Sequence, residues 1–497
     1  MSYALRVMRY TLEIIVFLCG AAVMIIELVG SRVLAPYVGT SIFVWTSLIG
    51  VILGSLSLGY WYGGKISDRY PNSRVLALII FSAGIYIALI ALIKFWLLLY
   101  IIKWITDIRG SSIIAALVLF CPPSVLLGMV SPYAVKLKLR ALAQSGATVG
   151  NLYALSTIGS IAGTFLAGFW LIPSFGITAI MYGVAVGLII VAALTYGHSW
   201  RTKILGAIII VIIFTGHNGY SQWLVSRGFV ETDTQYAHVL IFNDIDKASG
   251  QPVRRLNFEG NSQAAMFLNS DELVYEYTKY YDLAAHFKPG FTKALMIGGG
   301  AYSYPKHYLT AFPEATLDVV EIDPQLTYLA RQYFRLEDNP RLHIYHADGR
   351  IFLNRSQEKY DVIFNDAYRS TNSIPYQLTT REAVQRMYDI LADDGVALVN
   401  IISAIEGERG QFLRAEYRTF KSIFPQVYLF YVSSPQGEDV QNLILVALKN
   451  EQPPSLQSSN PKFKVYLGNL WQKELNLDEP ILTDEYAPVD KYIAQLL

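Results

Sequence analysis

The sequence predicts an α-helical membrane domain with several spans, followed by an α/β domain. The α/β domain should have a mostly parallel, Rossmann-like sheet and a small β-rich subdomain at its start. Three observations support this prediction. Apolar runs of about 20 residues recur through the first 220 positions, the length that crosses ~30 Å of hydrocarbon. Charged residues are scarce there and ordinary afterwards. From residue 293 onward strand and helix patterns alternate, as a parallel sheet requires.

The average composition conceals this division. The 497 residues are 53% hydrophobic and 16% charged, with a net charge of +1. Residues 1–220 contain 14 Lys or Arg and 4 Asp or Glu, whereas residues 221–497 contain the remaining 26 and 35. The two parts therefore carry net charges of +10 and −9. This excludes a wholly soluble enzyme and a disordered chain. No soluble part is basic, so we expect no nucleic acid partner.

The two cysteines, Cys19 and Cys121, both lie in apolar runs. They are too few for a disulfide framework or a Cys-based zinc site, and we expect no metal. The first apolar run is followed by further spans rather than by a cleavage site of small residues, so we expect no cleavable signal peptide.

Seven spans are expected, at residues 11–31, 41–62, 75–101, 112–134, 149–171, 177–197 and 203–217. Loop cations set the orientation of such helices. Ten fall on one side: Arg6, Arg9, Lys65, Arg69, Arg74, Lys136, Lys138, Arg140, Arg201 and Lys203. Three fall on the other: Arg32, Lys103 and Arg109. This bias predicts a multi-pass protein of the plasma membrane with a cytoplasmic N-terminus. Seven spans would then place the second half outside the cytoplasm.

We divide the chain into a membrane domain (1–219), a β-rich subdomain (220–290), a Rossmann-like domain (291–450) and a C-terminal extension (451–497). The subdomain should contain strands at 236–242, 255–258 and 264–267 and a helix at 271–286, because alternating apolar residues indicate half-buried strands. The Rossmann-like domain should contain strands at 293–297, 317–320, 342–346, 360–365 and 396–400, with a helix at 379–391.

Glycines and acids follow the ends of four of these strands. Gly298, Gly299 and Gly300 follow the first, and Glu321 ends the second, 21 residues after Gly300. Asp348, with Gly349, follows the third strand, and Asp366 follows the fourth. Ligands bind at the carboxyl ends of parallel strands, where glycines permit close approach and an acid accepts hydrogen bonds from ribose. The last glycine of the dinucleotide pattern is replaced by Ser303, so no pyrophosphate site is expected.

This order resembles S-adenosylmethionine-dependent transferases, and most closely the spermidine synthase (polyamine aminopropyltransferase) family. The leucine-aspartate-glycine-x-x-glutamine signature of that family is similar to Phe258-Glu259-Gly260-Asn261-Ser262-Gln263. Its aspartate-glutamate-x-x-tyrosine-histidine-glutamate signature is similar to Asp271-Glu272-Leu273-Val274-Tyr275-Glu276-Tyr277. Joined to a multi-span half, the domain looks like the membrane-fused spermidine synthase-like proteins.

The resemblance implies an aminopropyl transfer, as in polyamine biosynthesis, with decarboxylated S-adenosylmethionine or S-adenosylmethionine itself as donor. The glycine run would approach the donor, Glu321 would hold its ribose, and Asp348 its adenine. Gln263 and Tyr275 would border the substrate pocket. Asp366 would accept the proton of the attacking amine. The implied partners are the bilayer and an amine or membrane-associated acceptor. A homo-oligomer is expected because spermidine synthases are commonly oligomeric.

The departures from the family concern the substrate half of the site. Ala301 replaces the aspartate that faces the amino end of the decarboxylated donor, which also removes repulsion against the carboxylate of the intact donor. The catalytic loop reads Asp366-Ala367-Tyr368-Arg369, so a cation replaces the second acid of the family. Arg369, which we place in the substrate pocket, would repel a polyamine and is compatible with an anionic or lipid-associated acceptor.

Two other functions stay open. One is a methyltransferase that acts on a membrane-associated acceptor. The other is a polyamine transporter or sensor whose soluble domain binds a nucleoside without catalysis. The side of the soluble domain also stays open, because the charge bias favours the outside whereas the donor is a cytoplasmic metabolite.

Overall fold

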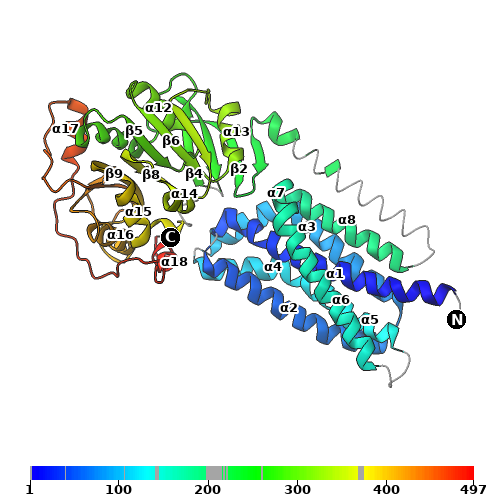
Figure 1. The fold of residues 1–497 in the computed structure, drawn as a ribbon. Coiled ribbons are helices and arrows are strands. Elements are labelled where there is room, and N and C mark those ends of the chain that lie inside the picture. The colour runs from blue at the N-terminus through cyan, green and yellow to red at the C-terminus, as the bar shows by residue number, and fades with distance from the viewer. Residues whose placement is uncertain are drawn as a thin grey trace. The chain divides into compact units, whose positions relative to one another are not determined.

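The computed structural model describes residues 3–39, 41–105, 107–139, 145–196, 215–216, 219, 222–258, 261–367 and 374–496. The chain divides into two compact units, residues 1–238 and 239–497 (Figure 1). Each unit has its own buried core.

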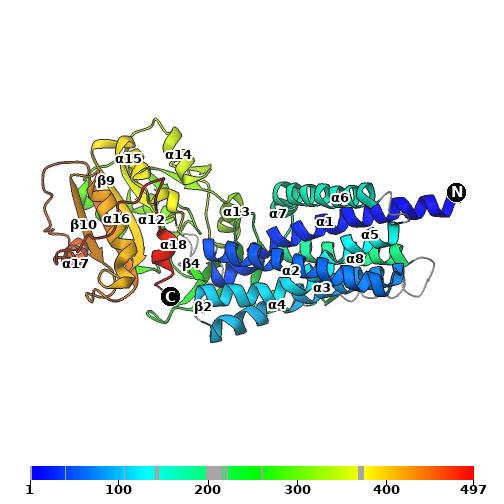
Figure 2. The same ribbon diagram turned by 90° about the horizontal axis from the view of Figure 1, so that it is seen from below.

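Among the described residues of the first unit there are six apolar helical spans, and they run side by side in Figure 2. Their bounds are Thr11–Val38, Ile42–Arg69, Ser73–Trp104, Ile108–Lys138, Ser145–Ser174 and Ile177–Thr195. The helices that form them are α1 (Tyr3–Val38), α2 (Ile42–Arg69), α3 (Ser73–Trp104), α4 (Ile108–Gly128) with α5 (Val130–Lys138), α6 (Ser145–Leu166) with the π-helical η2 (Ala167–Leu171) and α7 (Ile172–Ser174), and α8 (Ile177–Tyr196). All six are long and apolar enough to cross a membrane, and they coincide with the first six expected spans. The seventh, 203–217, lies almost entirely outside the described residues.

Small residues bring neighbouring helices of this unit close together. A Cβ atom at Gly159 would lie 2.0 Å from the carbonyl oxygen of Phe17, and one at Gly163 would lie 2.4 Å from that of Ala21. The backbones of α1 and α6 therefore touch, the kind of close packing through small residues that is also common between membrane helices. Helix α2 presents a similar face of buried residues spaced four apart: Ser55, Gly59, Gly63 and Ser67.

Polar contacts tie the last residues of the first unit to one end of the bundle. Asp233 ends strand β1 (Val230–Asp233), and its Oδ2 accepts a hydrogen bond from the backbone N–H of Ile177 at 2.7 Å. Arg32 Nη1 donates to the carbonyl oxygen of Tyr236 at 2.8 Å. Because Ile177 begins α8 and Tyr196 ends it, residues Tyr196 and Asp233 lie at opposite ends of the bundle.

The second unit begins with antiparallel strands, as the alternating pattern predicts. They are β2 (His238–Ile245), β3 (Pro252–Phe258) and β4 (Asn261–Phe267), each paired with the next. The helix expected at 271–286 begins later and is divided into α10 (Glu276–Lys279), the 3-10 turn η3 (Tyr280–Leu283) and α11 (Ala284–Phe287). All four residues of η3 are buried, so this segment packs on every side rather than along one helical stripe.

In the part of the second unit that the structure describes, seven strands form the main sheet, in the order β10-β11-β9-β8-β5-β6-β7. They are β5 (Lys293–Ile297), β6 (Thr316–Glu321), β7 (Leu342–His346), β8 (Tyr360–Asn365), β9 (Leu391–Ser403), β10 (Gln426–Tyr431) and β11 (Gln441–Leu448). Strands β5 to β9 are parallel, whereas β11 runs antiparallel to β9 and β10 antiparallel to β11. The chain builds outward from β5 through β6 to β7, then continues from β8 to β9 on the other side. The switch point lies between β5 and β8, where open α/β sheets bind ligands.

Helices cover both faces of this sheet. They are α12 (Ser303–Ala311), α13 (Pro324–Tyr333), α14 (Gly349–Arg355), η4 (Tyr376–Leu378), α15 (Arg381–Ile390), η5 (Glu408–Gly410), α16 (Gln411–Lys421), α17 (Pro461–Gly468) and α18 (Val489–Ile493). In β9, Val399 packs into one core with α15, α16 and α18, and Leu398 packs into the other with η3, α12 and α17. Both faces of β9 are buried because side chains alternate along a strand. The predicted fold class is confirmed.

Candidate active site

The glycine run forms a tight turn at the carboxyl end of β5. Gly298 has φ +97°, and a Cβ atom there would lie 2.4 Å from the carbonyl oxygen of Asp366. A side chain is therefore excluded both by conformation and by the neighbouring strand end. Gly300 has φ +52° and open space beside its Cα, so the backbone of the turn stays accessible to a ligand.

The side chain of Tyr302 packs against this turn. It has φ +57° and is fully buried, a left-handed conformation that costs a non-glycine residue ~1–2 kcal/mol. Its hydroxyl hydrogen-bonds with Thr327 Oγ1 at 2.8 Å, and its ring lies against Gly299. The packing of the phenol holds the backbone in this conformation.

Glu321, at the end of β6, reaches back to the glycine turn. Its Oε2 accepts hydrogen bonds from the N–H groups of Gly299 and Gly300 at 2.9 and 3.1 Å, and its Oε1 accepts one from Asp323 N at 2.9 Å. Burial raises the pKa of Glu321, while the three N–H donors act against that rise. The structure thus brings together the glycines and the acid that the sequence places 21 residues apart.

Asp348 and Gly349 mark the start of α14. Asp348 is the N-cap, because its Oδ1 accepts a hydrogen bond from Ile351 N at 3.0 Å. Gly349 is pressed against Ile297 at the end of β5, where a Cβ atom would lie 2.7 Å from Ile297 Cγ2. Two exposed apolar side chains follow the acids, Ile322 after Glu321 and Ile351 after Asp348. This end of the site therefore offers carboxylates and apolar surface together.

Asp366 lies at the switch point, directly after β8. Its Oδ1 accepts a hydrogen bond from Asn400 Nδ2 at 2.9 Å, and its Oδ2 accepts one from the Tyr277 hydroxyl at 3.2 Å. Burial raises the pKa of Asp366, whereas hydrogen bonds from Asn400, Tyr281 and Tyr277 act to lower it. A half-buried carboxylate held by neutral donors can accept a proton from a bound group.

The expected substrate-pocket residues come from β4 and from the segment before α10. Gln263 lies in β4 and is half-buried. The Tyr275 hydroxyl hydrogen-bonds with Ser262 Oγ at 2.5 Å, and the Tyr275 ring stacks on that of Tyr277 with centroids 6.1 Å apart. Tyr275 is thus linked to Asp366 through Tyr277. Arg369 lies outside the described residues.

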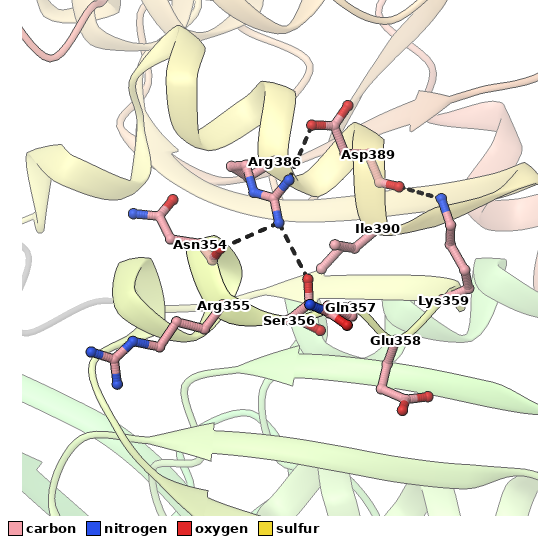
Figure 3. A pocket seen from close by; sticks show the side chains of 9 residues that line it. All are labelled: Asn354, Arg355, Ser356, Gln357, Glu358, Lys359, Arg386, Asp389 and Ile390. Atoms are coloured by element: carbon pink, nitrogen blue, oxygen red, sulfur yellow. Dashed lines mark hydrogen bonds and ion pairs between the residues drawn. The ribbon is translucent and has the colours of Figure 1, made fainter.

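A groove near the amino end of β8 is separate from this site, which lies at the carboxyl ends of the strands (Figure 3). It is lined by residues 354–359, which precede β8, and by Arg386, Asp389 and Ile390 of α15. Arg386 donates to the carbonyl oxygens of Leu353, Asn354 and Ser356, which end α14. The guanidinium therefore caps the carboxyl end of α14.

Two polar residues near Asp366 lie outside the set chosen from the sequence. Asn400 is a buried residue of β9, and Asn442 Nδ2 on β11 donates to Asn400 Oδ1 at 2.9 Å. The sequence contains one indication that Asn400 belongs to the site: this polar residue directly follows the apolar run Val396–Val399, near the carboxyl end of a strand. Asn442 is an ordinary polar residue before an apolar run, and its position depends on strand pairing.

The second unit is thus a Rossmann-like α/β domain in which glycines and acidic residues gather at the carboxyl ends of parallel strands. Residues 277–456 match the family described as the spermine/spermidine synthase domain. The second unit therefore contains a region similar to the spermine/spermidine synthase domain, and the resemblance to that family read from the motifs is confirmed.

Two curated relatives show how far the similarity extends. The polyamine aminopropyltransferase of Vibrio vulnificus is 29% identical over 217 residues, which are 41% of this chain and 71% of that protein. Polyamine aminopropyltransferase 1 of Streptomyces coelicolor is 23% identical over 415 residues, 79% of this chain and 75% of that protein. The second match is longer than the second unit, so it extends into the helical unit. The solved spermidine synthase of Thermotoga maritima covers 54% of this chain and 87% of its own, with 19% identity and a TM-score of 0.37.

Proposed function

We propose that the second unit transfers an aminopropyl group from decarboxylated S-adenosylmethionine to an amine acceptor, and that the first unit holds it in a membrane. The observation that carries this proposal is Asp366, a half-buried carboxylate at the switch point, beside the glycine turn and contacted by neutral donors. The curated relatives are polyamine aminopropyltransferases, which supports the same reaction.

The donor would occupy the edge between β5, β6 and α14. The accessible backbone at Gly300 suits close approach by the donor, and Glu321 can accept hydrogen bonds from ribose hydroxyls. Asp348 has one carboxylate oxygen engaged in the N-cap and a second that can accept from the adenine amino group. Ile322 and Ile351 offer apolar contact for a flat base. The residues present therefore fit a nucleoside.

The residues of this chain are assigned two tasks. They accept one proton, and they align the two bound substrates. A neutral amine attacks the carbon next to the sulfonium, so that a C–N bond forms and the C–S bond breaks. Methylthioadenosine leaves as a neutral thioether, and the proton released from the amine goes to Asp366. Alignment of two bound substrates supplies much of the remaining rate enhancement.

The substrate half supports an acceptor other than a simple diamine. In the described residues, Asp366 accepts hydrogen bonds from neutral groups, the amide of Asn400 and the phenol of Tyr277, whereas a second ammonium would require another carboxylate. An amine carried by a membrane-associated molecule fits this neutral surface and the membrane unit. A homo-oligomer belongs to the same proposal.

A second candidate is methyl transfer from intact S-adenosylmethionine. The observation that favours it is Ala301, which is buried beside the glycine turn and contributes no acid against the donor's carboxylate. The two reactions leave different by-products, methylthioadenosine for aminopropyl transfer and S-adenosylhomocysteine for methyl transfer.

The test uses the full-length protein in detergent. Calorimetric titration with each donor identifies the one that binds, and mass spectrometry after incubation with amine acceptors identifies the group transferred. Asp366→Asn should abolish transfer while donor binding persists, because the amide cannot take the proton. Asp348→Asn should weaken donor binding while keeping the N-cap, because asparagine also caps helices. Binding of neither donor would refute the proposal.

A further inference from the structure

Three adjacent strands place polar side chains in a row on one face of the main sheet. Asp366 follows β8, Asn400 lies in β9 and Asn442 lies in β11. Strands β8 and β9 are parallel with Asn365 opposite Val399, which puts Asp366 level with Asn400. Strands β9 and β11 are antiparallel with Asn400 opposite Ile444. Asn442 is therefore a diagonal neighbour of Asn400 on the same face.

The hydrogen bonds along this row run in one direction. Asn442 Nδ2 donates to Asn400 Oδ1 at 2.9 Å, and Asn400 Nδ2 donates to Asp366 Oδ1 at 2.9 Å. An asparagine side chain has a donor end and an acceptor end. As long as Asn442 donates to its oxygen, the Asn400 amide presents its N–H group to Asp366.

We propose that Asn442 is a positioning residue that keeps the Asn400 amide turned toward Asp366 and thereby keeps Asp366 ionised as the base of the transfer reaction. This inference rests on the proposed function, because it assigns to the Asn442–Asn400 pair the control of the proton acceptor in that reaction.

The pair matters because the surroundings of Asp366 are otherwise nearly neutral. In the described residues, the titratable groups that face it are the phenols of Tyr277 on α10 and Tyr281 on η3. The β5 turn contributes backbone at Gly298. Burial favours the protonated acid, so the hydrogen-bond donors decide how much of Asp366 is ionised. A reversed Asn400 would present a carbonyl oxygen, which a carboxylate can contact only when it holds a proton.

The direct test is Asn442→Asp in the full-length protein. Ionised aspartate only accepts hydrogen bonds, so it draws the N–H group of Asn400 away from Asp366. We expect the acidic limb of the pH profile of kcat/KM to move up by about one unit, a loss of about tenfold on that limb. Donor affinity should be unchanged, and activity should recover at high pH. Asn442→Leu, which removes the donor without adding an acceptor, should shift the limb less.

A double-mutant cycle separates the relay from simple charge repulsion, because the carboxylate introduced by Asn442→Asp would also repel Asp366 through space. In an Asn400→Leu background the relay is absent, so the shift caused by Asn442→Asp should shrink markedly. An equal shift in both backgrounds, or no shift in either, would overturn the proposal.

A readout without turnover distinguishes failure of this inference from failure of the proposed function. When the pKa of an acid is higher in the folded protein than in the unfolded chain, the protein loses folding stability as the pH rises above the pKa of the unfolded chain. Asn442→Asp should therefore lower the midpoint of thermal unfolding between about pH 4 and 8 more than Asn442→Leu does. The part of this difference that Asp366→Asn removes should shrink markedly when Asn400→Leu is also present. An equal part with and without Asn400 would refute the relay even in a protein that transfers nothing.

Discussion

Glu416 is a titratable residue that the fold buries away from water. It lies in α16 with 2% of its surface exposed, and its Oε2 has no hydrogen-bond partner among the described residues. Burial raises its pKa from 4.5 to about 8. In the unfolded chain the group ionises near pH 4.5, so folding stability falls as pH rises from there to about 8.

We expect Glu416→Gln to raise the midpoint of thermal unfolding at pH 8 by a few degrees and to leave it nearly unchanged at pH 4.5. The amide matches the shape of the neutral acid and removes its pH-dependent penalty, and each kcal/mol recovered raises the midpoint by about 2–4 °C in a domain of this size. Calorimetry across this pH range provides the measurement. Substitution of the exposed Glu485 by glutamine is the matched control. An equal effect at both pH values would contradict the assignment.

The C-terminal tail shows how one element stabilises another across the second unit. Asp484 lies beyond the residues that match the family. Its Oδ2 pairs with Arg350 Nη2 at 2.7 Å, and its Oδ1 accepts a hydrogen bond from Thr380 Oγ1 at 2.6 Å. Arg350 Nη1 also donates to Thr380 Oγ1 at 3.0 Å. The tail thus joins α14, which begins next to Asp348, to the start of α15.

We expect Asp484→Ala to weaken donor binding about fivefold, because a half-exposed ion pair contributes up to ~1 kcal/mol. Hydrogen exchange at residues 376–382 should increase, since the tail no longer holds the turn before α15. Calorimetric titration measures the affinity, and mass spectrometry measures the exchange. Asp484→Glu should restore most of the binding. An unchanged donor affinity would show that the tail contributes only to the stability of the fold.

For the whole molecule, the path of the chain constrains its topology. Tyr196 and Asp233 lie at opposite ends of the helical bundle, because Asp233 contacts Ile177 at the start of α8. Helix α6 precedes α8 and begins at Ser145, near the end that holds Tyr196. The described part of the first unit therefore leaves the bundle at Asp233, at the end opposite to the start of α6.

We expect single cysteines at Ala147 and at Gln235 to react with a membrane-impermeant maleimide from opposite sides of the membrane. Both side chains are exposed, and replacement of Cys19 and Cys121 removes competing thiols. The excess of Lys and Arg predicts that Ala147 faces the cytoplasm. Gln235 would then face outward, and the donor would have to reach the second unit on that side. Labelling of both positions from one side would contradict the path described here.

Local sequence patterns predict the strands and the residues that follow them, whereas contacts between distant segments follow from the fold. The strand at 293–297 and the residues Gly298, Glu321, Asp348 and Asp366 were predicted from the sequence, because strand periodicity and the carboxyl-edge rule act within short segments. The helix at 271–286 was predicted too long, since burial on all sides of Tyr280–Leu283 replaced an amphipathic stripe.

By itself, the sequence determined the two-part architecture, the parallel sheet and the glycine and acidic residues at its edge. These depend on composition, periodicity and chain order. Only the tertiary structure decided that Asn442 reaches Asn400, that Asp484 joins α14 to the start of α15, and that Asp233 returns to the start of α8. Each of these contacts joins residues more than 40 positions apart. Strand register and the packing of two buried faces determine which distant residues meet. No local sequence pattern encodes either.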